Sequence, residues 1–109
     1  MMAETCMEWI ESQRIAGEVM NRDEKLLKKL EHERSRIGAE IADARRMMVN
    51  AMVEIETRKA NGRGTSRIID APAFYMASIE KLGARIGKID EQIIIAREEM
   101  HDIADLIGV

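Results

Sequence analysis

The chain has 109 residues, of which 46% are hydrophobic and 34% charged, while aromatic residues make up only 3%. Large aromatic side chains dominate the buried area of compact cores, so this composition argues against a thick globular core and favours long helices or a coiled coil. The net charge of −3 argues against nucleic acid as the main partner, because a DNA-binding domain carries a clustered basic face.

The N-terminal segment and the single cysteine indicate the cellular compartment. Residues 1–20 carry acidic residues where a secretory signal peptide needs positive charge followed by an apolar stretch. No apolar run approaches the ~18 residues of a membrane-spanning helix. Cys6 is the only cysteine, which excludes an intramolecular disulfide and fits a reducing compartment. We therefore expect a cytosolic protein that does not insert into a membrane.

A first helix is expected from about residue 5 to residue 60. Thr5 and Glu8 have the spacing of a capping box, which predicts the start of the helix near Thr5. Arg58 and Lys59 would lie at the negative end of the helix dipole. Gly62 is a plausible left-handed stop directly after them.

The heptad repeat of this first helix is irregular. Its core positions are Ala16, Met20, Asp23, Leu27, Leu30, Arg34, Ile37, Ile41, Ala44, Met48, Ala51 and Ile55. Asp23 and Arg34 interrupt the repeat with charge, and Met47 and Met52 widen the apolar stripe. The widening predicts that residues 44–55 contact more than one neighbour. Together with Met48, these methionines either fill the seam or form a flexible surface that repacks against partners.

The segment KANGRGTSRIIDAPAF, residues 59–74, separates two helical patterns. We expect Asp70 as the N-cap of a second helix, with Pro72 in its first turn. A phosphate-binding loop is disfavoured because residues 62–64 lack the G-x-x-x-x-G-K-[ST] spacing and follow no strand. The segment also holds four large apolar residues, Ile68, Ile69, Phe74 and Tyr75. They either clasp the end of the hairpin or form a surface for a partner.

The second helix is expected from about residue 71 to residue 107 and has a regular heptad repeat. Its ten seam positions are Tyr75, Ile79, Leu82, Ile86, Ile89, Ile93, Ala96, Met100, Ile103 and Ile107. Such a repeat implies a left-handed supercoil, and heptad helices joined by a short loop usually pack antiparallel. The predicted fold is all-α: one domain over residues 1–109, with two long helices forming an antiparallel coiled-coil hairpin. The first twenty or so residues should overhang the hairpin, fold back or meet another chain.

No set of residues predicts catalysis, a cofactor or a metal. Glu98 and His101 have the i, i+3 spacing of di-iron bundles, but such sites need a second pair and two further glutamates. His32, Glu98 and His101 also lie off the seam. Cys6 is expected near a frayed terminus, and none of the serines has an adjacent base. A hairpin also lacks the concave site that catalysis normally requires. We predict a protein that is not an enzyme and binds no cofactor.

The stretch NGRGTSRIIDAPAFYMASIEKLGARIGKIDEQI resembles the central segment of the FliJ/YscO-type stalk proteins of the flagellar and type III secretion export apparatus. The matching pieces are Asn61-Gly62, Arg67-Ile68-Ile69, Phe74-Tyr75 and Ile79-Glu80-Lys81. The resemblance implies a hairpin similar to the rotary stalk of F-type ATP synthases. It also implies three partners: an export ATPase ring, the cytoplasmic domain of the export gate, and export chaperones. The location would be the cytoplasm, at the periphery of the inner-membrane export apparatus.

The resemblance further implies where the partners bind. A gate-contacting surface would lie on both helices near the reversal, at Met47, Met48, Ala51, Phe74, Tyr75 and Ile79, joined there by the apolar Ile68 and Ile69. The ATPase side would be the opposite end, at Trp9, Arg14 and Arg22. Two other classes stay open: a self-associating coiled-coil adaptor or small chaperone that binds client helices, and a helical appendage that binds RNA.

Overall fold

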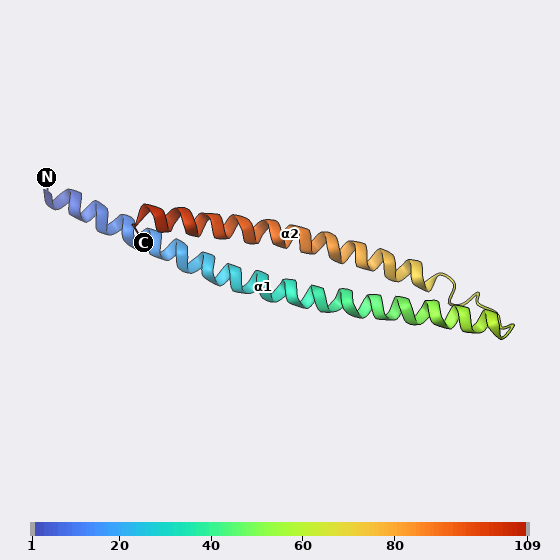
Figure 1. Ribbon diagram of the computed structural model, residues 1–109. Coiled ribbons are helices and arrows are strands. Elements are labelled where there is room, and N and C mark those ends of the chain that lie inside the picture. The colour runs from blue at the N-terminus through green and yellow to red at the C-terminus, as the bar shows by residue number, and fades with distance from the viewer. Residues whose placement is uncertain (1, 109) are drawn as a thin grey trace. The chain divides into compact units, whose positions relative to one another are not determined.

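The computed structural model describes residues 2–108 and contains two helices, α1 (Met2–Ala60) and α2 (Ala71–Leu106) (Figure 1). The prediction of an all-α antiparallel hairpin is confirmed. The start of α1 differs from the prediction, because the helix already includes Thr5 and begins at Met2. The capping box at Thr5 therefore does not begin the helix. The side chain of Thr5 lies outside the part of the chain that the structure describes.

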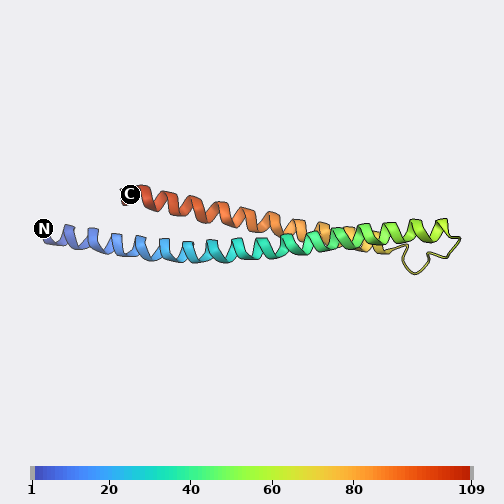
Figure 2. The ribbon, with the colours of Figure 1, turned by 60° about the horizontal axis from the view of Figure 1, so that its bottom comes forward.

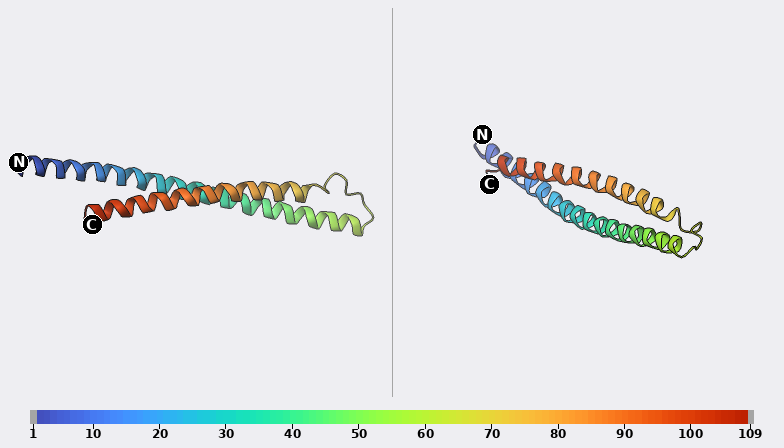
Figure 3. Two further views of the ribbon diagram at one scale, coloured as in Figure 1. Left: turned by 90° about the horizontal axis from the view of Figure 1, so that it is seen from above. Right: turned by 45° about the vertical axis from the view of Figure 1, so that its right-hand side comes forward.

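The chain divides into two compact units, and both helices run through both of them. We call residues 1–32 with 89–109 the terminal unit, and residues 33–88 the reversal unit. Within each unit the segment of α2 lies alongside the segment of α1, as further views show (Figures 2 and 3). Ion pairs join the two helices in both: Arg22–Glu99 at 3.2 Å in the terminal unit and Arg85–Glu33 at 3.6 Å in the reversal unit.

The predicted heptad seam of α2 is confirmed. All ten of its positions are buried or half-buried, and Ile89, Ile93 and Ala96 are buried most deeply. The register predicted for α1 also holds, since Leu30, Ile37 and Ile55 are buried. The two charged residues at core positions of α1 differ in their burial. Arg34 is exposed, as a long side chain allows, whereas the short side chain of Asp23 is buried.

The end of α1 is a Schellman motif centred on Gly62. The residue has φ of 69°, a left-handed conformation that favours glycine. The N–H of Gly62 donates to the carbonyl of Lys59 at 3.1 Å, and the N–H of Arg63 donates to the carbonyl of Arg58 at 2.7 Å. These are the two bonds of the motif, so the predicted stop at Gly62 is confirmed.

The reversal, residues 61–70, doubles back along the last turns of α1 before α2 begins (Figure 1). Ile68 and Ala71 line one groove with Ala51 and Glu54. The first residue of α2 thus lies roughly two turns before the end of α1, instead of opposite its last residue. Asp70 directly precedes α2, and its carbonyl accepts the N–H of Phe74 at 3.1 Å, as an N-cap residue does.

The first twenty or so residues were expected to overhang the hairpin, fold back or meet another chain, and part of this segment lies beside the end of α2. In the terminal unit, Leu106 and Ile107 line a groove together with Trp9 and Ala16. The end of α2 therefore reaches α1 near Trp9.

Candidate partner-binding surfaces

A mostly apolar groove lies in the reversal unit where the loop returns along α1. Its volume is about 450 Å³, and its lining residues are Met47, Asn50, Ala51, Glu54, Ile68, Ala71 and Tyr75. Residues three and four apart share one face of a helix, which places Met47, Ala51 and Glu54 together. The returning loop adds Ile68, and the first turns of α2 add Tyr75. Four residues of the predicted gate-contacting surface therefore meet in this tip groove: Met47, Ala51, Ile68 and Tyr75.

The apolar residues of the reversal separate into two groups. Ile68 and Tyr75 are half-buried, whereas Ile69 is exposed and Phe74 has 67% of its surface exposed. The rings of Phe74 and Tyr75 meet edge to face, with centroids 5.5 Å apart and planes at 75°. Such a contact holds the exposed ring in place against its neighbour. Ile68 and Tyr75 thus close the end of the hairpin, while Ile69 and Phe74 face solvent.

The methionines of residues 47–52 also separate into half-buried and exposed side chains. Met48 is half-buried at its seam position, as is Ile79 on α2, whereas Met47 and Met52 are exposed. The predicted second neighbour of residues 44–55 is the returning loop, because Ile68 lines the tip groove beside Met47 and Ala51. Met48 and Ile79 therefore belong to the seam, and Met47 belongs to the surface.

Sequence reasoning missed other exposed apolar residues of the reversal unit. Val49 and Val53 of α1 and Met76 of α2 are exposed, and none of them occupies a seam position. Their positions off the heptad repeat were the sequence signal that could have identified them as exposed apolar residues. Asn50 and Glu54 were missed as polar members of the tip groove. The carboxylate of Glu54 accepts a hydrogen bond from Nε of Arg58 at 2.8 Å, so its charge is partly compensated.

A second groove lies in the terminal unit, at the end that the resemblance assigns to the ATPase. It has a volume of about 330 Å³ and is lined by Trp9, Ser12, Gln13, Ala16, Leu106 and Ile107. Trp9 is 64% exposed, and Leu106 is exposed even more. Tryptophan combines a large apolar area with an N–H donor, which suits a residue that contacts a partner.

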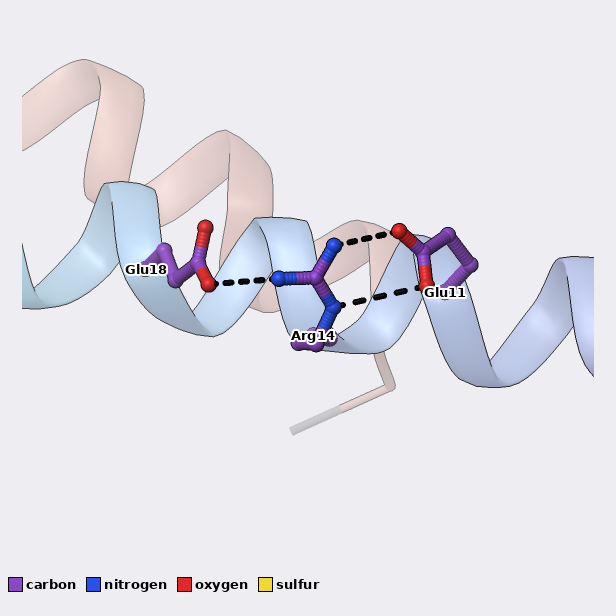
Figure 4. Close-up of polar contacts among 3 residues, drawn as sticks. All are labelled: Glu11, Arg14 and Glu18. Atoms are coloured by element: carbon purple, nitrogen blue, oxygen red, sulfur yellow. Dashed lines mark hydrogen bonds and ion pairs between the residues drawn. The ribbon is translucent and has the colours of Figure 1, made fainter.

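The two arginines predicted for this end are both engaged within the protein. The guanidinium of Arg14 binds the carboxylate of Glu11 through two nitrogens and that of Glu18 at 2.7 Å (Figure 4). The hydrogen bond with Glu11 and the charge of Glu18 raise the pKa of Arg14 further above its usual value. Arg22 donates to Glu99 at 3.2 Å. Neither guanidinium offers an uncompensated positive charge to a partner.

The part of the chain that the structure describes contains no group of three or more His, Cys, Asp or Glu side chains that could hold a metal ion. Glu98 and His101 are exposed, and Nε2 of His101 lies 3.5 Å from the carboxylate of Asp105. Over residues 2–108, neither helix has a stretch long and apolar enough to cross a bilayer.

Comparison with known protein families, with curated proteins and with solved structures gives no match for this chain. Any indication of function must therefore come from the exposed surfaces of the chain. Two surfaces that carry large exposed apolar side chains are the reversal, with Phe74 and Ile69, and the groove beside Trp9.

Proposed function

We propose that this protein is a non-enzymatic coiled-coil stalk that binds a different partner at each end. Following the resemblance to FliJ/YscO-type proteins, the stalk would couple the export ATPase ring to the export gate of a type III apparatus, flagellar or virulence, in the cytoplasm beside the inner membrane. Export chaperones are a third class of partner. One observation carries the proposal: the reversal unit exposes Phe74, Ile69 and Met47, and Met47 lines a groove there. Exposed apolar patches of this kind mark interaction sites.

The tip groove suits a protein partner. Ala51, Ile68, Ala71 and Tyr75 of its lining are half-buried, and Ala51 and Tyr75 are seam positions, so this part of the surface is formed before binding. Phe74 is largely exposed, and its ring meets edge to face the ring of Tyr75, which lines the groove. Aromatic residues in such positions contribute most of the binding energy of many interfaces. The gate domain is the proposed partner of this surface.

The ATPase ring is the proposed partner of the terminal unit, with Trp9 and Leu106 as the contacting residues. Arg14 and Arg22 are less suitable, because Glu11, Glu18 and Glu99 already compensate their charges. The proposed contact with the ATPase ring is therefore made by apolar side chains and not by the two arginines. It follows that raised salt should weaken ATPase binding only slightly, since exposed ion pairs are screened while apolar contacts are not.

Binding of the purified chain to the cognate ATPase and gate domain, measured by isothermal titration calorimetry, tests the proposal. Phe74→Ala should weaken gate binding by about tenfold or more and leave ATPase binding intact, as expected of an anchor residue. Trp9→Ala should do the opposite. Ile94→Ala, which also truncates an exposed apolar side chain, is the matched control and should change neither.

Helicity is recorded alongside each measurement, because a variant that unfolds would also lose binding. Phe74→Ala should keep the circular dichroism of the wild type, since its ring is mostly exposed. If the wild-type chain binds neither the ATPase nor the gate domain, the export proposal is wrong.

A second candidate, a self-associating adaptor or small chaperone, is favoured by a different observation. Val49, Val53, Ile94 and Ile95 are all exposed although they lie on helices and off the seam. A second copy or a client helix would cover such side chains. Val53→Glu separates this candidate from the stalk, because it should dissociate an adaptor and leave a monomeric stalk folded. Met48→Glu is less informative, because Met48 is half-buried in the seam.

A further inference from the structure

A buried carboxylate lies in the seam of the terminal unit. Asp23 occupies a core heptad position of α1 and is only 2% exposed. Its Oδ2 atom is buried and has no hydrogen-bond partner. Its Oδ1 atom lies 3.8 Å from Nε of Arg22, whose Nη2 donates to Glu99 at 3.2 Å. One guanidinium is therefore shared between two carboxylates, and the cluster keeps a negative charge.

Asp23 lines a cavity of about 290 Å³ between α1 and α2. The other lining residues are Leu26, Gln92, Ile95, Ala96 and Glu99. Leu26 and Ile95 are exposed and supply apolar walls, and the small, buried Ala96 also lines the cavity. The cavity far exceeds the ~30 Å³ that one water occupies, so a long side chain can enter it.

The residues that line this cavity favour a positively charged side chain as its ligand. Burying a carboxylate without full compensation is unfavourable, and an apolar residue of similar size would suit the seam better. Polar residues that oppose local packing rules are concentrated at functional sites. A carboxylate at the floor with apolar walls complements a side chain that has methylene groups and a charged end, and a guanidinium matches a carboxylate through two hydrogen bonds.

We propose that the groove at Asp23 docks a helix of a partner protein by receiving one of its arginine side chains. The methylene groups of that arginine would lie against Leu26 and Ile95, and its guanidinium would meet the carboxylate of Glu99. Oδ2 of Asp23 is covered in the free chain, and a small outward turn of the Asp23 side chain on docking would let the guanidinium donate to it. A helix is the fitting element because the cavity lies in a groove between two helices, where a third helix packs. The site is separate from the tip groove and from Trp9, and it does not depend on the export assignment.

A pair of synthetic helical peptides tests the site on the full chain. The first carries a central arginine flanked by leucine one turn before and one turn after it. The second has citrulline in place of arginine, which keeps the shape and removes the charge. In ¹⁵N-resolved NMR titrations the arginine peptide should shift the amides of Asp23, Leu26, Ile95 and Glu99. The citrulline peptide should bind about tenfold more weakly or worse, as the loss of a charged hydrogen bond predicts.

Two protein variants complete the experiment. Asp23→Asn removes the negative charge that the arginine of the peptide would meet. This variant should weaken binding of the arginine peptide by a similar factor. Asp43→Asn is the matched control, because it neutralises an exposed carboxylate of the reversal unit and should leave binding unchanged. Asp23→Leu should raise the melting temperature while abolishing binding, because the carboxylate is unfavourable in the unoccupied seam.

Several outcomes would overturn the proposal. Equal binding of the arginine and citrulline peptides, or of the wild type and Asp23→Asn, would show that Asp23 receives no cation. A fall in melting temperature for Asp23→Leu would give the carboxylate a structural role instead. A wild-type dimer that Ile95→Glu dissociates would show that a second copy of the chain covers the groove.

Discussion

Ile37 is fully buried, with 0% of its surface exposed, and lies at a core position of α1 in the reversal unit. Ile94, in contrast, is an exposed isoleucine of α2. The same residue type thus occurs both fully buried and exposed. A buried aliphatic side chain stabilises the fold by its removal from water and by close packing, and an exposed one does neither.

Ile37→Ala should lower the free energy of unfolding by roughly 2–4 kcal/mol, because the truncation removes buried methyl groups and leaves a cavity. Urea unfolding followed by circular dichroism measures the loss. Ile94→Ala is the control and should change the free energy of unfolding by less than about 0.5 kcal/mol. Equal losses for the two variants would contradict the burial pattern of the seam.

Phe74 and Tyr75 show why neighbouring residues of similar chemistry have different roles. On a helix, consecutive side chains point about 100° apart, so only one of the two can face the seam. Tyr75 is the first seam position of α2 and is half-buried, whereas Phe74 points toward solvent. Substitution of both residues together would mix a loss of packing with a loss of binding. Phe74→Ala alone isolates the surface.

At the scale of elements, glycine has opposite effects in the two helices. Gly62 ends α1 in a left-handed conformation with φ of 69°. Gly83 lies inside α2, and a Cβ added there would meet nothing within 4 Å. A side chain strains the backbone at the first position and restricts the unfolded chain at the second.

Gly62→Ala should destabilise the hairpin by roughly 1 kcal/mol, the cost of a left-handed conformation for a residue with a Cβ. Gly83→Ala should stabilise it by about 0.5–1 kcal/mol, because alanine favours the helix interior over glycine. Thermal unfolding of both variants beside the wild type checks the opposite signs. A gain of stability at Gly62 would contradict the Schellman motif.

The reversal acts as an element in its own right, although it has no regular secondary structure. Its return along α1 supplies Ile68 to the tip groove and sets which residues of α2 meet which residues of α1. The hydrogen bond from Arg58 to the carbonyl of Gly64, at 3.4 Å, joins the loop to the helix it follows. Within the reversal unit, the loop therefore determines both the register of the two helices and the shape of the proposed partner surface.

At the scale of the whole molecule, the buried apolar core of the described residues is small. It consists of Leu30, Ile37, Ile55, Ile89, Ile93 and Ala96. Small cores give marginal stability, and association often adds to it. Here each helix already covers the seam of the other, so the most regular apolar surfaces have their partner within the chain.

We therefore expect the melting temperature to stay constant over roughly a hundredfold range of protein concentration, as for a monomer. Differential scanning calorimetry measures this, and sedimentation equilibrium gives the mass directly. A melting temperature that rises with concentration, and a mass that Val53→Glu reduces to that of one chain, would instead support the self-associating adaptor.

By itself, the sequence determined the two helices, the seam of α2 from Tyr75 to Ile107, and the boundaries at Gly62 and Asp70. These features depend on residue spacing and on backbone preferences, which act locally and can be read along the chain. The candidate partner surface near the reversal was also predictable in outline, because Phe74 and Ile69 are large apolar residues in a segment that is usually polar.

The tertiary structure alone decided three things: the return of the reversal along α1, the separation of exposed Phe74 from half-buried Tyr75 and Ile68, and the burial of Asp23. Asp23 and Arg34 looked alike as interruptions of one heptad repeat, yet only Asp23 is buried. The physical reason is that burial depends on which side chains meet across the two helices. Those contacts join residues far apart in the sequence, which no local pattern specifies.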